Sequence, residues 1–186
     1  MPDLILFILG AGLILLLCWL KERFTGFQAQ RPQDYAKDGP VFDIRRHLNG
    51  PMSCDGVLYG PFGRVSSRFT ARMHGSWQGN TGTLVEDFRY DSGTEQRREW
   101  HLTSANDGTF KATAPDVIGT GEGVQMGSAI RLQYRIKLTE SAGGHELDVT
   151  DWIYLLDNGS LVNRSQMRKF GVKVAELVAT IRPEPV

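Results

Sequence analysis

Strict alternation of apolar and polar residues marks two long segments of the chain. In residues 130–138 the apolar face is formed by Ile130, Leu132, Tyr134, Ile136 and Leu138, while arginine, glutamine and lysine occupy the other parity. Residues 65–77 alternate in the same way. A period of two with one charged face is typical of an antiparallel strand whose other face is buried. Both segments are therefore predicted to be strands of a sheet with one wet side.

Seven further segments carry strand patterns, namely 53–59, 82–91, 95–103, 109–125, 146–156, 160–168 and 172–182. Turn residues such as Asn106-Asp107-Gly108 and Asp157-Asn158-Gly159 separate most of them and favour short hairpins. Strands in this order pack as a sandwich or close into a barrel, and closure removes the exposed edges. We predict an all-β fold, an antiparallel up-and-down lipocalin-like barrel of about 8–10 strands. A helical turn at Asp43–Leu48 is expected to plug one end.

The amino-terminal run is apolar on all faces. Leu4 to Leu20 contains seventeen residues without a charge, near the short limit for crossing a hydrocarbon core of about 30 Å. A cleaved signal peptide needs a positive n-region, and here the run follows Met-Pro-Asp. We favour one uncleaved transmembrane helix at 1–23, followed by a linker at 24–41, the barrel domain at 42–182 and a tail at 183–186.

Charge and composition exclude several function classes. Lys plus Arg and Asp plus Glu number 21 each, so the chain lacks the basic surface expected of a nucleic-acid-binding protein. The two cysteines, Cys18 and Cys54, do not form a disulfide framework. The four histidines are scattered without metal-ligand spacing. We therefore predict no metal, no cofactor and no nucleic-acid partner.

Several polar residues share a parity with the apolar set. Glu86 lies on the face of Leu84 and Phe88, and Arg98 on the face of Trp100. Asp151 shares a face with Ile153, and Asn163 and Ser165 share one with Leu161, whereas Trp152 and Arg164 have the opposite parity. A buried carboxylate is costly unless it is paired. Glu86 and Arg98 are expected to pair across adjacent strands, and Asp151 to meet Asn163, Arg164 or Ser165 across the following hairpin.

Three interpretations of these polar residues remain open. They could form internal ion pairs that fix the strand register, or bind the polar head of an amphipathic ligand in an apolar pocket. The third is catalysis, with Glu86 or Asp151 as an acid or base of shifted pKa. No catalytic residue is assigned.

Longer motifs support a family resemblance. TGTLVEDFRYDSGTEQRREW, Pro-Asp-Val-Ile-Gly at 115–119, DWIYLLD with LVNRSQMRKFGVKVAEL, and the opening FDIRRHLNGP resemble a bacterial domain-of-unknown-function family of small lipocalin-like envelope proteins, often lipoproteins. The resemblance runs from about Phe42 to Ile181 and implies a lipocalin-like barrel, an envelope location and a fatty-acyl ligand. It singles out Glu86, Asp87, Arg98, Trp100, Asp116, Gly119, Asp151, Trp152, Asn163, Arg164, Ser165, Lys169 and Phe170.

The charge distribution and the family resemblance give different answers about the side of the membrane on which the domain lies. Leu17 precedes Cys18, which departs from a lipidation signal. Lys21, Arg23, Arg31 and Lys37 follow the span, so the positive-inside rule points to a cytoplasmic domain. The resemblance implies a periplasmic domain anchored in the inner membrane, and we follow the resemblance.

The leading functional hypothesis is a membrane-anchored barrel that binds or carries a lipid or fatty-acyl ligand. One alternative is a lipid-modifying isomerase or hydratase that uses Glu86 or Asp151. The other is a non-catalytic scaffold in an envelope complex, whose protein partners the sequence does not identify. A binding role is favoured over an enzymatic one.

Overall fold

A computed structural model describes residues 2–185 and divides into two compact units, which meet in sequence between Asp34 and Tyr35. Met1, in the predicted anchor, and Val186, in the predicted tail, lie outside the described residues.

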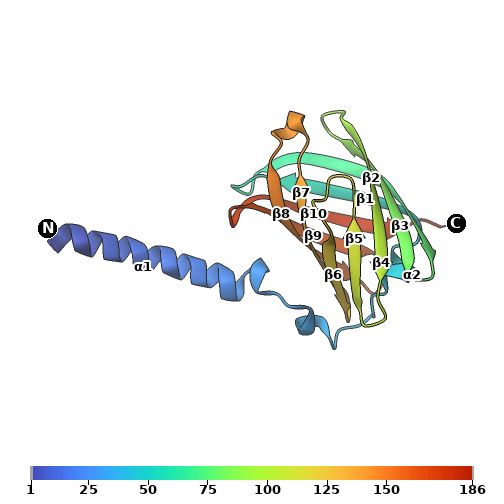
Figure 1. Ribbon diagram of the computed structural model, residues 1–186, viewed down its shortest axis with the longest axis horizontal. Coiled ribbons are helices and arrows are strands. Elements are labelled where there is room, and N and C mark those ends of the chain that lie inside the picture. The colour runs from blue at the N-terminus through green and yellow to red at the C-terminus, as the bar shows by residue number, and fades with distance from the viewer. Residues whose placement is uncertain (1, 186) are drawn as a thin grey trace. The chain divides into compact units, whose positions relative to one another are not determined.

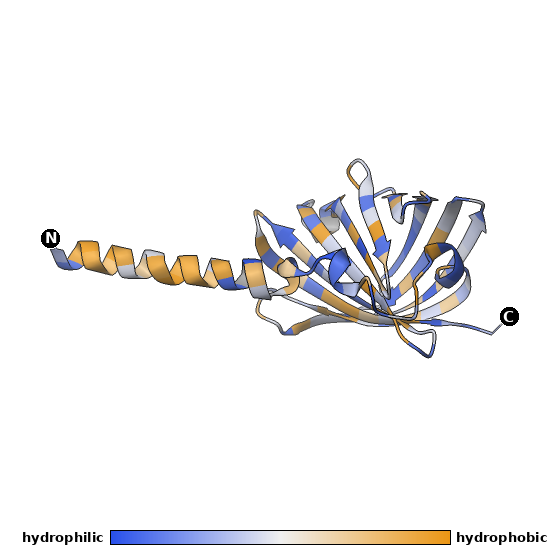
Figure 2. Ribbon diagram, turned by 90° about the horizontal axis from the view of Figure 1, so that it is seen from below, coloured by the Kyte–Doolittle hydropathy of each residue, from blue (hydrophilic) through white to orange (hydrophobic). Residues whose placement is uncertain are grey.

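The first unit is dominated by helix α1, Pro2–Thr25. The helix is apolar along most of its length, as Figure 2 shows, with Asp3 in its first turn and Arg23 in its last, an order that complements the helix dipole. Its 24 residues extend about 36 Å at 1.5 Å per residue. Among the described residues it is the one helix long and apolar enough to span a membrane, and signal sequences share these properties. Two 3-10 turns follow, η1 (Phe27–Ala29) and η2 (Pro32–Tyr35).

The second unit is a closed antiparallel barrel of ten strands, which confirms the predicted fold class (Figure 1). Each strand pairs with the next in sequence, and β1 closes the barrel by pairing with β10 from Met52↔Pro183 to Tyr59↔Glu176. The strands are β1 Gly50–Tyr59, β2 Val65–Gln78, β3 Thr81–Tyr90, β4 Glu95–Ser104, β5 Thr109–Thr113, β6 Gly121–Met126, β7 Ala129–Lys137, β8 Glu146–Leu155, β9 Leu161–Lys169 and β10 Val172–Pro183. A 3-10 turn, η3 (Glu140–Ala142), lies between β7 and β8.

The strand predicted at 109–125 is wrong in its extent. The structure has two strands there, β5 and β6, separated by the loop 114–120. Pro115 has no backbone N–H for a ladder bond, and Gly119 has a positive φ of 75°. The loop instead lies along β7, where Val117 bridges Ile136 and the Lys137 N–H donates to the Asp116 carbonyl at 2.9 Å. This loop carries Asp116 to the barrel wall.

The short helix α2, Ile44–His47, closes the end of the barrel at which β1 begins, as the sequence predicted. The Asp43 carboxylate caps it by accepting from the Arg45 N–H at 2.9 Å. Ile44 is fully buried, and the Trp77 Nε1 donates to the Leu48 carbonyl at 2.9 Å. Gly75 is required here, since a Cβ at this position would collide with the Leu48 carbonyl.

Residues 35–42, which we call the strap, contact the outer wall of the barrel. Tyr35 packs on Trp152 and Tyr154 with ring centroids 5.3 and 5.5 Å apart. The Phe42 N–H donates to the Gly127 carbonyl at 2.8 Å, and the Tyr35 carbonyl approaches Gly127 so closely that only glycine fits. Gly127 also has a positive φ of 54°.

Candidate functional site

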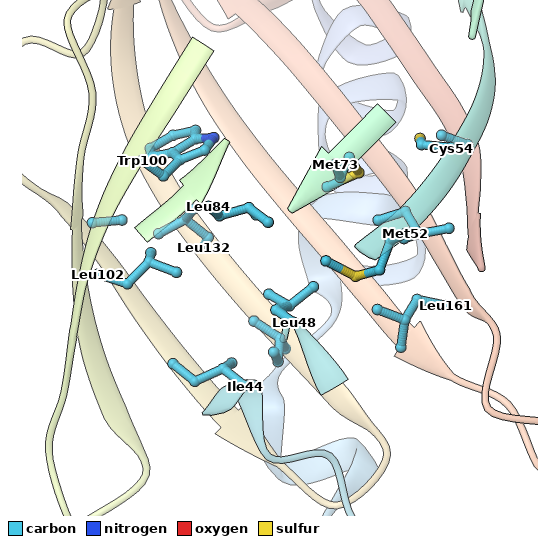
Figure 3. Packing of buried hydrophobic residues seen from close by; sticks show 14 of the residues in the cluster. Ile44, Leu48, Met52, Cys54, Met73, Leu84, Trp100, Leu102, Leu132 and Leu161 are labelled. Carbon is cyan, nitrogen blue, oxygen red and sulfur yellow. The ribbon is translucent and has the colours of Figure 1, made fainter. Parts of the chain in front are cut away.

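The barrel interior contains a cavity of about 150 Å³ above the α2 plug. Most of its lining is apolar, and Figure 3 shows Trp100, Leu84 and Leu132 on one side of the interior, with Met73 and Cys54 on the other. Each of these side chains comes from the inward parity of its strand, so the alternation in the sequence creates the apolar lining. The polar residues that line the cavity are Glu86, Arg98, Tyr134, Asp151, Asn163 and Ser165.

Arg98 lies at the centre of the polar cluster. It stands directly opposite Glu86 in the β3–β4 register, as predicted, but its Nε donates to Asp116 Oδ1 at 3.1 Å. Its guanidinium carbon lies 4.1 Å from the centroid of the Trp100 ring, a distance typical of a cation–π contact. Glu86 instead accepts a hydrogen bond from Trp100 Nε1 at 3.2 Å. The expected Glu86–Arg98 pair is therefore a network that includes Trp100 and Asp116.

The second half of the cluster is built across the β8–β9 hairpin. Asp151 is opposite Ser165 in register, and its carboxyl group interacts with the hydroxyl groups of Ser165 and Tyr134. The Ser165 hydroxyl donates to Asn163 Oδ1 at 3.1 Å, and Asn163 Nδ2 donates to the Trp152 carbonyl at 3.2 Å. The predicted meeting of Asp151 with Asn163 and Ser165 thus occurs on the inner wall.

Two predicted members of the cluster, Trp152 and Arg164, lie on the outer face of the barrel, because their parity is opposite to that of the inward-facing residues. Trp152 points outward, where it is 1% exposed beneath the Tyr35 ring. Arg164 is also on the outer face, where its Nε donates to Glu176 at 2.6 Å. Neither side chain lines the cavity. Asp116 reaches the cluster through Arg98 without lining the cavity itself.

Burial changes the acid–base properties of the cluster. Glu86 and Asp151 retain some accessible area because the cavity reaches them, yet both lie deep below the protein surface. Desolvation raises the pKa of Glu86 from 4.5 to about 7, although Arg98 and the Trp100 hydrogen bond oppose the change. Desolvation also raises the pKa of Asp151 above its ordinary value. Burial thus shifts the protonation of both acids toward the neutral form.

Two polar atoms of the cluster are buried without a hydrogen-bond partner, Nη2 of Arg98 and Oδ1 of Asp151. Both residues line the cavity. A buried donor and a buried acceptor without partners are costly, and native proteins contain few of them.

Tyr134 is the cluster member that sequence reasoning assigned only to an apolar face. Its place in the cluster could have been inferred from its position on the inward parity of 130–138, because a buried tyrosine hydroxyl needs a hydrogen-bond partner.

Cys54 is buried beside the cavity, where desolvation raises the pKa of its thiol to about 12, as expected of an inert structural cysteine. Among the described residues no group of three or more His, Cys, Asp or Glu could hold a metal ion.

Comparison with known proteins places this barrel in a family. Residues 22–183 match the family described as "Protein of unknown function (DUF3833)". No curated protein matches the chain significantly. Rv2717c from M. tuberculosis is similar in fold, with a TM-score of 0.54 and 16% identity over 80% of this chain and 100% of its own. The S-type phycobiliprotein lyase CPES from Guillardia theta has a TM-score of 0.55 and 6% identity over 84% and 99% of the two chains.

Proposed function

The chain belongs to the DUF3833 family of proteins of unknown function, and we propose that its barrel binds a small amphipathic ligand of the lipid or fatty-acyl type. The observation that carries the proposal is the pair of unpartnered polar atoms, Arg98 Nη2 and Asp151 Oδ1, in side chains that line a mostly apolar cavity. An apolar pocket with a few converging polar groups is the usual form of a small-molecule site.

The size of the cavity limits the ligand. Cavities that hold drug-sized ligands measure about 300–1,000 Å³, and this one measures about 150 Å³. An apolar cavity of about 150 Å³ accommodates a molecule of the size of benzene. The ligand is therefore a short acyl compound, or a longer one that inserts only one end. A cavity of this size also argues against the filled barrel that a pure scaffold would have.

We further propose that α1 anchors the barrel to the inner membrane through the segment that follows the helix, with the barrel on the periplasmic side. The length and apolar surface of α1 support the anchor, and the resemblance to envelope proteins supports the side. Fusions of alkaline phosphatase and of a fluorescent protein to the carboxy terminus test this topology. Phosphatase activity agrees with the periplasmic assignment, and fluorescence alone contradicts it.

A second candidate is acid–base catalysis on the bound molecule by Glu86, as in an isomerase or hydratase. The observation that favours it is the pKa of Glu86 near 7 at the cavity wall, because a general acid or base works best when its pKa is close to the working pH.

Native mass spectrometry of the full chain in lipid nanodiscs tests the binding proposal. The protein should carry a small-molecule adduct that Ala179→Leu removes, since Ala179 lines the cavity and leucine would occupy it. Val178→Leu is the matched control, because Val178 is the neighbouring residue on β10 and is 37% exposed. Wild-type protein without any adduct, even after incubation with short-chain acyl compounds, would refute the proposal.

A further inference from the structure

The polar atoms of the cavity offer a donor and an acceptor together. Nη2 of Arg98 can only donate, whereas Oδ1 of Asp151 keeps acceptor lone pairs whether the acid is ionised or neutral. Both are buried and belong to residues that line the same cavity. A ligand head that satisfies both must carry an acceptor and a donor of its own.

The charges around the cavity disfavour an anionic head. Arg98 is the one basic side chain among the described residues of the lining, and its Nε is already bonded to Asp116 at 3.1 Å. Glu86 and Asp151 line the cavity as well, so the cluster contains three carboxyl groups for one guanidinium. Because Asp116 already pairs with that guanidinium, a carboxylate on the ligand would enter a poorly solvated site without a free cation to balance it.

A cationic head is disfavoured for a different reason. The guanidinium of Arg98 lies 4.1 Å from the centroid of the Trp100 ring and 5.7 Å from that of the Tyr134 ring. The aromatic faces of Trp100 and Tyr134, which lie in the polar cluster, are therefore already beside a fixed positive charge. Burial also raises the pKa of Glu86 to about 7, which weakens the attraction of this carboxyl group for a cation near neutral pH.

We propose that the cavity selects an uncharged head group with both an acceptor and a donor, such as a primary amide or an alcohol, on a short apolar body. The acceptor receives a hydrogen bond from Arg98 Nη2, and the donor bonds to Asp151 Oδ1. This inference rests on the proposed binding function and names the ligand class of the same site.

Isothermal titration calorimetry on the full chain in nanodiscs tests the head group at pH 7.5. The probes are hexanamide, hexanoate and hexylammonium, which share a six-carbon body, and empty nanodiscs give the background for partition into lipid. Hexanamide should bind at least about tenfold more tightly than either ion, since a site built for hydrogen bonds rejects analogues that leave its polar groups unpaired. Ala179→Leu should abolish the binding of hexanamide.

Asp151→Asn provides a second readout, because it removes one carboxyl group and keeps the shape of the side chain. The preference for hexanamide over hexanoate should fall in Asp151→Asn and remain in Asp148→Asn, whose side chain pairs with Arg135 on the outer face. Tightest binding by hexanoate or by hexylammonium would overturn the head-group assignment and leave the binding proposal intact. Failure of all three probes to bind would overturn both.

Discussion

Replacement of Glu86 by glutamine tests whether the cavity holds a buried acid whose proton affinity the fold has changed. Burial raises the pKa of this carboxyl group from 4.5 to about 7. Below the lower value both the folded and unfolded states carry the proton. Between the two values only the folded state keeps it, so the free energy of unfolding falls as the pH rises. Above about 7 both states are ionised and the loss is complete.

The size of the effect follows from the two pKa values. A tenfold change in proton affinity corresponds to about 1.4 kcal/mol. The wild-type barrel should therefore lose about 3 kcal/mol of stability from Glu86 between pH 4.5 and pH 7.5. Glu86→Gln has no such proton to lose, so its stability relative to wild type should rise by the same amount over this range.

Urea unfolding of the full chain in nanodiscs, followed by tryptophan fluorescence from pH 4.5 to pH 8, measures this difference. Any effect of the amide that does not depend on pH cancels, because only the change with pH is compared. Asp87→Asn is the control, since Asp87 is the next residue on β3 and forms an exposed ion pair with Arg97. If the free energies of unfolding of wild type and Glu86→Gln change with pH in the same way, burial does not raise the pKa of Glu86 and the reasoning is refuted.

Three further predictions concern the wall and the strap. Trp152→Ala should destabilise the barrel by about 3–5 kcal/mol in urea unfolding, because Trp152 is 1% exposed under Tyr35, and Leu156→Ala, at a residue 42% exposed, should cost far less. Gly127→Ala should speed proteolysis of the strap more than Gly63→Ala does, since both glycines have positive φ but only Gly127 meets a carbonyl; equal rates would contradict the close contact. Arg98→Met should cost about 1–3 kcal/mol in thermal or urea unfolding, a value kept moderate because Asp116 is 32% exposed and water can replace part of the lost ion pair. An unchanged or increased stability would contradict a net stabilising role for the pair with Asp116.

Much of the barrel could be predicted from the sequence because its strands have one wet face. The alternation of 130–138 and 65–77 identified inward and outward residues that the structure confirms at Leu132, Tyr134 and Met73. The division of 109–125 was missed because β5 and β6 are short and the loop between them turns at Pro115-Asp116 before Val117 bridges β7. Period-two patterns do not reveal which extended segments share a ladder.

The inward polar residues were also predictable, but their partners were not. Parity placed Glu86, Arg98 and Asp151 inside, whereas the partner of Arg98 proved to be Asp116, which lies on a loop without alternation. The outward position of Trp152 follows from parity as well, and its burial there depends on Tyr35, a residue from the segment predicted to be a linker. Contacts between irregular segments and a barrel wall depend on tertiary geometry, which a local pattern does not encode.

Methionine methyl NMR on the full chain in nanodiscs tests the central claim most directly, because the chain carries its own reporters. Met73 and Met167 line the cavity, whereas Met126, at the end of β6, does not. Titration with hexanamide should shift the methyl resonances of Met73 and Met167 along one saturating curve and leave that of Met126 in place. Shifts of all three in proportion to added compound, or no shift at Met73 and Met167, would contradict a ligand site inside the barrel.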